Sequence, residues 1–358
     1  MIKKALSRIL IALFGVILLL LIVGIIVFPR ADLPTPVKED FCAENNIRFD
    51  TTSLEKIYFD PEGILADPEA FLNEDPAYRM LAETRAKVAA PFQFESWLED
   101  IEKLASKTEE NRENQKSFKL YELIMAHQQS FCKEVGPHVL AYLPEGTDLG
   151  VNIYLTALDD PVPACAKGQD ITFSLSHPLF AYAAVLHEPT ALSSFFNLAL
   201  HELFHIGFSD NFKPPSLEEH MENEVVIDML IVLHNEGIAT HIEHELSTQY
   251  PSPFEWFLYM IDQKPIVRWY FNRMNDLFAI AQTKPTGDAY KDIYRRIGSL
   301  GFDRKGFYII GAYMAMTIEE ELGREALIQT IVDGYESFAD TFNSIAEEGM
   351  LIRWRPEP

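Results

Sequence analysis

The sequence has little positive charge and few cysteines. Its 358 residues contain 30 Lys and Arg against 54 Asp and Glu, which gives a formal net charge of −24 at pH 7. A surface this acidic repels phosphates, and no basic patch occurs beyond the first residues, so we expect no nucleic-acid partner. The three cysteines, Cys42, Cys132 and Cys165, include no CxxC pair, which excludes a cysteine-rich zinc site on spacing. In an oxidising compartment one pair could form a disulfide, and the sequence does not say which.

A long apolar run occurs at the N-terminus. Residues 9–28 are all apolar or glycine, and at ~1.5 Å per residue such a helix crosses the ~30 Å hydrocarbon core of a membrane. Lys3, Lys4 and Arg8 precede the run, which places the N-terminus in the cytoplasm and the remaining chain outside. A cleaved signal peptide is the alternative, although its apolar core would be shorter and would end in small residues. We therefore predict that residues 1–30 form a retained single-pass anchor in the cell membrane.

The rest of the chain predicts helices, then a small sheet, then more helices. Asp-Pro pairs predict helices that begin at Pro68 and Pro76, and residues 113–135 predict a helix that ends at Gly136-Pro137. Short runs with β-branched or aromatic residues predict strands at 139–143, 151–158 and 171–175. Most residues from 178 onward are compatible with helix. The predicted fold class is α+β, mostly α, with a helical N-terminal region at 31–137 and a second domain at 138–358.

His201-Glu202-Leu203-Phe204-His205 is the motif that carries chemistry. It lies in an apolar stretch, residues 190–208, that predicts a largely buried helix. His201 and His205 are one turn apart with Cβ atoms ~5–6 Å from each other, so both imidazoles reach one Zn²⁺ at ~2.0–2.1 Å. Glu202 lies about 100° round the helix from His201, where it flanks a metal and can deprotonate a water. The alternative is a pair of core histidines, which is costly because these side chains would be buried without partners.

The third metal ligand is expected to be a carboxylate on a second helix. Asn211 stands where the longer HExxHxxGxxH pattern requires a histidine. Residues 217–246 predict that second helix, with Ser216 as its N-cap. Its other histidines, His220, His234, His241 and His244, are expected to face solvent for the most part.

Two glutamates on this helix are candidates for the third ligand. Glu236 shares its face with apolar residues, and the small Gly237 and Ala239 permit a close approach to the histidine helix. Glu224, nineteen residues after His205, is the alternative, and it requires a much shorter path of the chain. In that case Asp228, one turn later, would orient a ligand histidine.

The motif and the later Asn235-Glu236-Gly237-Ile238-Ala239 resemble the gluzincin metallopeptidases, particularly an uncharacterised bacterial branch with a wide His-to-Glu gap. Residues 305–315 are similar to the Tyr-x-x-Gly-x-x-Met-Ala helix that follows the metal site there. The resemblance covers residues 151–342 and implies a zincin-like fold with Zn²⁺ on His201, His205 and Glu236. It also implies Glu202 as general base and Tyr308 as a hydroxyl that stabilises the oxyanion. This chain departs from the aminopeptidase gluzincins, in which the glutamate ligand comes nineteen residues after the second histidine, the position of Glu224 here.

The resemblance implies a peptide or protein substrate, bound in extended form along an exposed strand such as residues 171–174. The sequence therefore predicts a membrane-anchored zinc metallopeptidase whose catalytic domain is extracytoplasmic. The alternative is a membrane-anchored binding or scaffold protein with an inactive or structural metal site.

Overall fold

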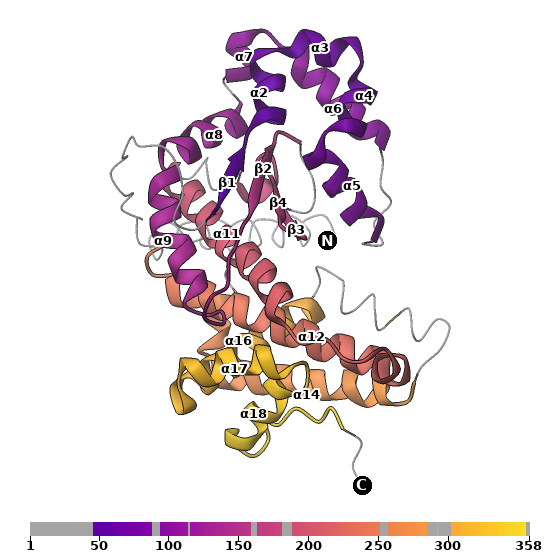
Figure 1. Cartoon of the computed structure of the whole chain (residues 1–358), viewed down its shortest axis with the longest axis vertical. Coiled ribbons are helices and arrows are strands. Elements are labelled where there is room, and N and C mark those ends of the chain that lie inside the picture. The colour runs from indigo at the N-terminus through magenta and orange to yellow at the C-terminus, as the bar shows by residue number, and fades with distance from the viewer. Residues whose placement is uncertain are drawn as a thin grey trace, which may run out of the picture.

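The computed structural model describes residues 46–87, 94–113, 115–158, 163–180, 188–250, 257–284, 292 and 302–355. The predicted anchor, residues 1–30, lies outside them. Within this part the chain is mostly helical with one small mixed sheet, as predicted (Figure 1). The N-terminal helices are α2 (Thr52–Phe59), α3 (Pro61–Ala66), α4 (Pro68–Glu74), α5 (Pro76–Lys87), α6 (Phe94–Ala105), α7 (Glu109–Glu113), α8 (Lys116–Ala126) and α9 (Gln128–Leu140). The later helices are α11 (Glu188–Asn211), α12 (Leu217–Leu246), α13 (Leu258–Ile261), α14 (Lys264–Gln282), α16 (Phe302–Leu322), α17 (Arg324–Asp333) and α18 (Ser337–Ile345).

Local capping sets the starts of the N-terminal helices. The Asp67 side chain accepts a hydrogen bond from the Ala70 N–H at 2.9 Å, and Asp75 accepts from the N–H groups of Ala77 and Tyr78. Each aspartate precedes a proline at the first helical position, so α4 and α5 begin where they were predicted.

The prediction of one helix over residues 113–135 is wrong. The chain leaves helical geometry at His127, between α8 and α9. In addition, α9 continues through Pro137 to Leu140, so the predicted stop at Gly136-Pro137 and the predicted strand at 139–143 are also wrong. Val139 and Tyr142 are fully buried, and this packing outweighs the hydrogen bond that the proline removes.

The sheet has four strands in the order β1-β2-β4-β3, with parallel pairing except between β3 and β4. Its strands are β1 (Arg48–Asp50), β2 (Asn152–Thr156), β3 (Ala164–Lys167) and β4 (Asp170–Ser174). The strands predicted at 151–158 and 171–175 are confirmed as β2 and β4. Because β4 pairs on both sides, the expectation that residues 171–174 form an exposed edge is wrong, and β3 is the strand at that edge.

Helix α12 packs against both α11 and α16, and in Figure 1 α11 runs beside the strands while α12 and α16 lie below them. At the crossing of α12 and α16, a Cβ added to Gly237 or Gly311 would lie 2.5–2.6 Å from backbone atoms of the facing helix. The two backbones are therefore in direct contact, which only glycine permits. One hydrophobic core extends from Ile47 to Trp354 and includes the N-terminal helices as well as these three.

In the described part of the chain, one helix is long and apolar enough to cross a membrane. It is residues Asn223–Leu246 of α12, and 72% of its most apolar window is buried inside the fold. A helix buried by its own protein in this way is a core helix, and it carries Glu236 into the interior.

Candidate metal centre

Helix α11 presents both histidines of the motif from a buried position. The helix covers the predicted residues 190–208, and Leu200, Leu203 and Phe204 are fully buried around the motif. The imidazole rings of His201 and His205 lie on one face with centroids 4.5 Å apart. A Cβ at Gly207 would lie 2.1 Å from Leu143 Cδ1, so this glycine lets α11 pack closely on the chain after α9.

Helix α12 brings its carboxylate to these histidines by running back along α11. Its start is fixed by a capping box between Ser216 and Glu219, as the predicted N-cap requires. The helix then bends at Asn223, where the backbone leaves helical geometry. The part of the helix after this bend carries Asn235, Glu236 and Glu243 to the histidines of α11.

The structure brings Glu236 to the histidines and leaves Glu224 at the surface. Oε2 of Glu236 lies 3.0 Å from His201 Nε2 and 3.6 Å from His205 Nε2. One ligand atom from each of the three residues lies within 4.8 Å of the others. Glu224 is exposed, and Asp228, which was expected to orient a ligand histidine in the alternative, contacts His220 at 2.9 Å.

The second nitrogen of each imidazole is held from behind. His201 Nδ1 lies 3.3 Å from Oε2 of Glu243, a side chain only 3% exposed, and His205 Nδ1 lies 2.9 Å from Oδ1 of Asn235. An oxygen that accepts the Nδ1 proton leaves Nε2 of the same ring with its lone pair toward the metal position. Neither oxygen was predicted, although Glu243 follows Glu236 by two helical turns and so shares its face.

These residues fit a zinc ion. Two nitrogens and an oxygen at ~2.0–2.1 Å in tetrahedral geometry are separated by roughly 3.3 Å, and the observed distances of 3.0 and 3.6 Å lie on either side of that value. Three protein ligands leave one position open, as in catalytic rather than structural zinc sites.

The pKa shifts of His201 and Glu236 agree with this fit. Burial lowers the pKa of His201, but the carboxylates of Glu243 and Glu236 raise it more, so that it lies well above its ordinary value. Burial raises the pKa of Glu236, but the two histidines hold it well below its ordinary value. Protons therefore compete with Zn²⁺ for these groups.

Glu202 and Tyr308 lie beside the metal centre rather than in it. Burial raises the pKa of the Glu202 carboxyl above its usual range, an effect that His205 and His201 partly offset. Tyr308 comes from α16, and its ring centroid lies 5.7 Å from that of His201. Lys305 Nζ lies 4.7 Å from the centroid of the Tyr308 ring, a cation–π contact on the same helix.

A cavity of about 220 Å³ opens beside the metal centre. Residues from α11, from α12 and from the β3–β4 hairpin line it: Glu202, His205, Ile206, Ser209, Asn235, Glu236, Ala166, Lys167 and Gly168. A reacting group placed in this cavity would therefore meet the Glu202 carboxylate together with His205 and Glu236.

Comparisons with known proteins agree with this site. Residues 67–349 match a family model described as "Putative zinc dependent peptidase (DUF5700)". Searches of curated proteins and of solved structures found no match. The family match spans well over half of the chain and includes every residue of the centre. The chain therefore belongs to this family of zinc-dependent peptidases, and zinc is its cofactor.

Proposed function

We propose that the protein is a gluzincin-type metallopeptidase with a zincin-like catalytic domain, in which His201, His205 and Glu236 hold zinc. The observation that carries this proposal is the convergence of two Nε2 atoms and one carboxylate oxygen beside a cavity. An oxygen lies behind each ring, 2.9 Å from His205 Nδ1 and 3.3 Å from His201 Nδ1, and this arrangement favours rings that turn Nε2 toward a metal.

Glu202 is the general base in this proposal. Zinc bound to the centre supplies Lewis-acid chemistry, because it polarises a carbonyl and lowers the pKa of water. The Glu202 carboxylate accepts a proton from the attacking water and returns it to the leaving amine. Its raised pKa supports this role, since a carboxyl that titrates nearer neutrality exchanges protons more readily at working pH. The Tyr308 hydroxyl is proposed to donate a hydrogen bond to the oxyanion.

An extended peptide is proposed to bind along β3. This strand lies at the edge of the sheet, and its residues Ala166 and Lys167 line the cavity. Main-chain hydrogen bonds to an edge strand hold a peptide of any sequence in register, with alternate side chains pointing into pockets. Such a peptide would pass the metal centre with one residue in the cavity.

We also propose that residues 1–30 anchor the protein in the cell membrane and that the catalytic part is extracytoplasmic. The apolar run at 9–28 supports the anchor. Cys132 is disulfide-bonded and Cys165 is a buried thiol, while Cys42 lies outside the described residues. Disulfides persist in oxidising compartments, which supports an extracytoplasmic position.

Metal analysis and a Glu202→Gln variant test the proposed function. The purified chain should contain one zinc per molecule and cleave members of a peptide library read by mass spectrometry. The amide keeps the size of the side chain but cannot accept a proton, so turnover should fall by roughly 10²–10⁴-fold while zinc stays bound. Glu224→Gln, an exposed change on α12, is the matched control and should change neither quantity. Stoichiometric zinc without cleavage of any peptide would instead indicate a binding or scaffold protein with an inactive site.

A further inference from the structure

One cation lies at the cavity beside the metal centre. Among the residues that line the cavity, Lys167 has the only positively charged side chain, whereas Glu202 and Glu236 contribute carboxylates. Counted with a zinc ion, the lining has a net positive charge, so a negatively charged group of a substrate can enter it.

The β3–β4 hairpin fixes the position of the Lys167 backbone. Gly168 makes the turn with a φ of +60°. The next residue, Gln169, donates from Nε2 to Asp210 Oδ2 at 2.6 Å, which ties the hairpin to the end of α11. The Gln169 carbonyl accepts from the Asn152 N–H at 2.9 Å, which ties it to β2. These bonds hold the hairpin against the helix that carries Glu202 and His205.

The Lys167 side chain, in contrast, is held only by an exposed ion pair and can exchange its partner. Its Nζ pairs with the carboxylate of Glu83 from α5, and both side chains are 48% exposed. An exposed ion pair contributes little net stability because water solvates both charges well. A carboxylate of a bound substrate can therefore replace Glu83 on Lys167 at small cost.

We propose that Lys167 Nζ binds a carboxylate of the peptide substrate in this cavity and releases Glu83 when it does so. This inference rests on the proposed peptidase function and specifies its substrate class. The cavity, at about 220 Å³, is smaller than the ~300–1,000 Å³ of sites for whole small-molecule ligands, so it receives a single residue. The carboxylate comes either from an Asp or Glu side chain or from the C-terminus of the peptide.

Peptide binding to the full-length, zinc-loaded Glu202→Gln protein tests this inference without turnover. Three forms of one fluorescent peptide distinguish the sources: a neutral amidated form, an amidated form with one Glu, and a neutral form with a free C-terminus. Fluorescence anisotropy should give roughly 5- to 10-fold tighter binding for one of the two carboxylate forms than for the neutral form. The form that gains affinity identifies an acidic side chain or a terminal carboxylate as the group recognised.

Variants at the ion pair show whether Lys167 causes the preference. Added to Glu202→Gln, Lys167→Met should remove the gain of the carboxylate peptides over the neutral peptide, whereas Lys167→Arg should keep that gain. Glu83→Gln should tighten binding of carboxylate peptides by a few-fold, because it removes the competing anion. Lys213→Met, an exposed lysine outside the cavity lining, is the matched control and should have no effect.

The outcomes separate this inference from the proposed function. Binding of the neutral peptide with no gain for either carboxylate, or a gain that survives Lys167→Met, would overturn the role of Lys167 alone. Failure of the native chain to bind or cleave any of the peptides in the panel and library would overturn both proposals.

Discussion

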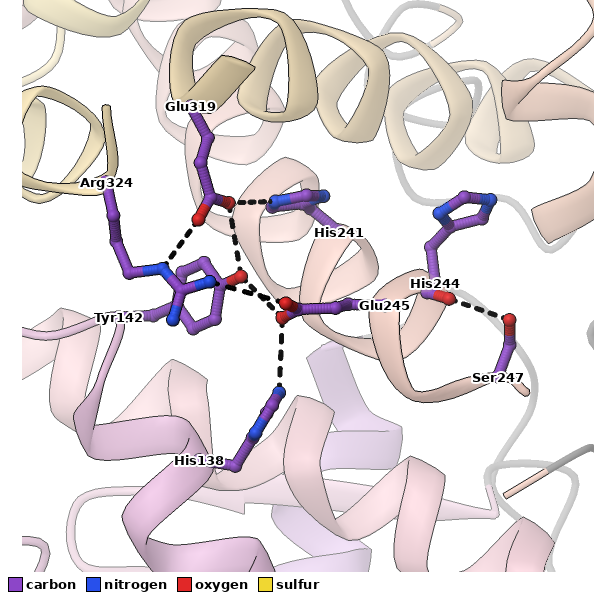
Figure 2. A network of polar contacts seen from close by, with 8 residues as sticks. All are labelled: His138, Tyr142, His241, His244, Glu245, Ser247, Glu319 and Arg324. Atoms are coloured by element: carbon purple, nitrogen blue, oxygen red, sulfur yellow. Dashed lines mark hydrogen bonds and ion pairs between the residues drawn. The ribbon is translucent and has the colours of Figure 1, made fainter. Parts of the chain in front are cut away.

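Helix α12 carries two clusters of histidine and carboxylate side chains, and only one of them has the form of a metal site. The first is the metal centre at Glu236. The second, which we call the arginine network, lies near the end of the helix and consists of His138, Tyr142, His241, Glu245, Glu319 and Arg324 (Figure 2). It joins α12 to α9, to the chain after α9, to α16 and to the start of α17. The two clusters contain the same kinds of acid and base, so their difference shows what makes a metal site.

The difference is a cation that the chain supplies itself. In the network, Arg324 donates from Nε to Glu319 Oε1 at 2.6 Å and from a terminal nitrogen to Glu245 at 3.3 Å. The Tyr142 hydroxyl lies between the two carboxylates, 2.5 Å from Glu245 Oε2 and 3.1 Å from Glu319 Oε2, and its single proton is shared between them. Burial raises the pKa of Glu319, but the hydrogen bonds and positive charges of His241 and Arg324 lower it by more, so that the pKa is about 2.

At the metal centre, no ion pair between described residues joins Glu202, Glu236 or Glu243 to an arginine or lysine. Among the described ion pairs, those of Glu236 are with the two histidines only. Two further glutamates, Glu202 and Glu243, lie beside the same imidazoles. Carboxylates that no arginine or lysine neutralises through a described ion pair have excess negative charge, which an external divalent cation can balance.

Removing the central carboxylate from each cluster should give the largest difference in zinc content, with zinc lost from one variant and kept by the other. Glu236→Ala removes one of the three proposed ligands and leaves two imidazoles, so the purified variant should contain almost no zinc and should not cleave peptides. Glu319→Ala should keep one zinc per chain and lose only stability. Metal analysis after dialysis against a weak chelator measures both. Retention of zinc by Glu236→Ala together with its loss from Glu224→Ala would show that the ligand is Glu224.

Disturbing the helix crossing that both clusters share should have the next largest effect. In Gly311→Ala the added methyl would lie 2.5 Å from Gly237 Cα and from the Leu233 carbonyl oxygen. Overpacking against side chains costs ~1–3 kcal/mol, and here the obstacle is backbone, so we expect at least ~3 kcal/mol of lost stability and weaker zinc binding. Urea unfolding of the zinc-free form measures the loss of stability, and the additional stability of the zinc-bound form measures zinc binding.

Gly63→Ala provides the control for this change. Gly63 lies in α3 with nothing within 4 Å of an added Cβ, so alanine there should be neutral or stabilise by up to ~1 kcal/mol. Equal effects of the two substitutions would mean that the α12–α16 contact is looser than the structure indicates.

A smaller effect is expected from the carboxylate behind His201. Glu243→Gln keeps a hydrogen-bond acceptor but removes the charge that supports the imidazole, and such changes typically weaken metal binding by 10–100-fold. Glu245→Gln, two residues later in the arginine network, should leave zinc affinity unchanged. Competition with a chromogenic chelator measures the zinc dissociation constant of each variant. Similar affinities in both would indicate that Glu243 is a packing residue with no influence on the metal.

The parts of this arrangement that depend on local sequence could be predicted. The HExxH spacing, the Ser216 cap and the apolar face around Glu236 with Gly237 beside it are all local patterns. They predicted the two helices and favoured the three residues that the structure brings together, with Glu224 kept as the alternative to Glu236. Side chains that meet across helices could not be predicted in this way. The contact between Glu243 and His201 depends on the bend at Asn223 and on the register of α12 against α11.

The same reasoning explains the elements that were missed. Strand β1 has three residues and β3 reads Ala-Cys-Ala-Lys, so neither has a pattern of its own, and each exists because a neighbouring strand pairs with it. His234 and His241 were expected to face solvent but are buried. His234 is stacked on Phe338, with ring centroids 4.6 Å apart, and His241 lies 2.6 Å from Glu319. Both partners come from distant parts of the chain, and the helix sequence alone does not reveal them.

The smallest expected effect is a pH dependence that belongs to the arginine network alone. The pKa of Glu319 is about 2 in the folded chain and 4.5 in its ordinary state, so the carboxylate stabilises the fold above about pH 4.5. This contribution is lost as the pH falls from 4.5 through about 2, because the proton then binds the unfolded chain and finally the folded one. Partial exposure of Glu319 reduces this stabilisation to roughly 1–2 kcal/mol.

Urea unfolding of the zinc-free chain should therefore show a difference of this size in the free energy of unfolding between wild type and Glu319→Gln at pH 7, and the difference should narrow as the pH approaches 2. Zinc-free protein is required because the metal centre titrates as well, and its titration is common to both proteins. Glu320→Gln, the exposed neighbour on α16, should show no gap at any pH. A gap that stays constant from pH 7 to pH 2 would mean that Glu319 acts by packing, and the contrast between the two clusters would then not rest on charge.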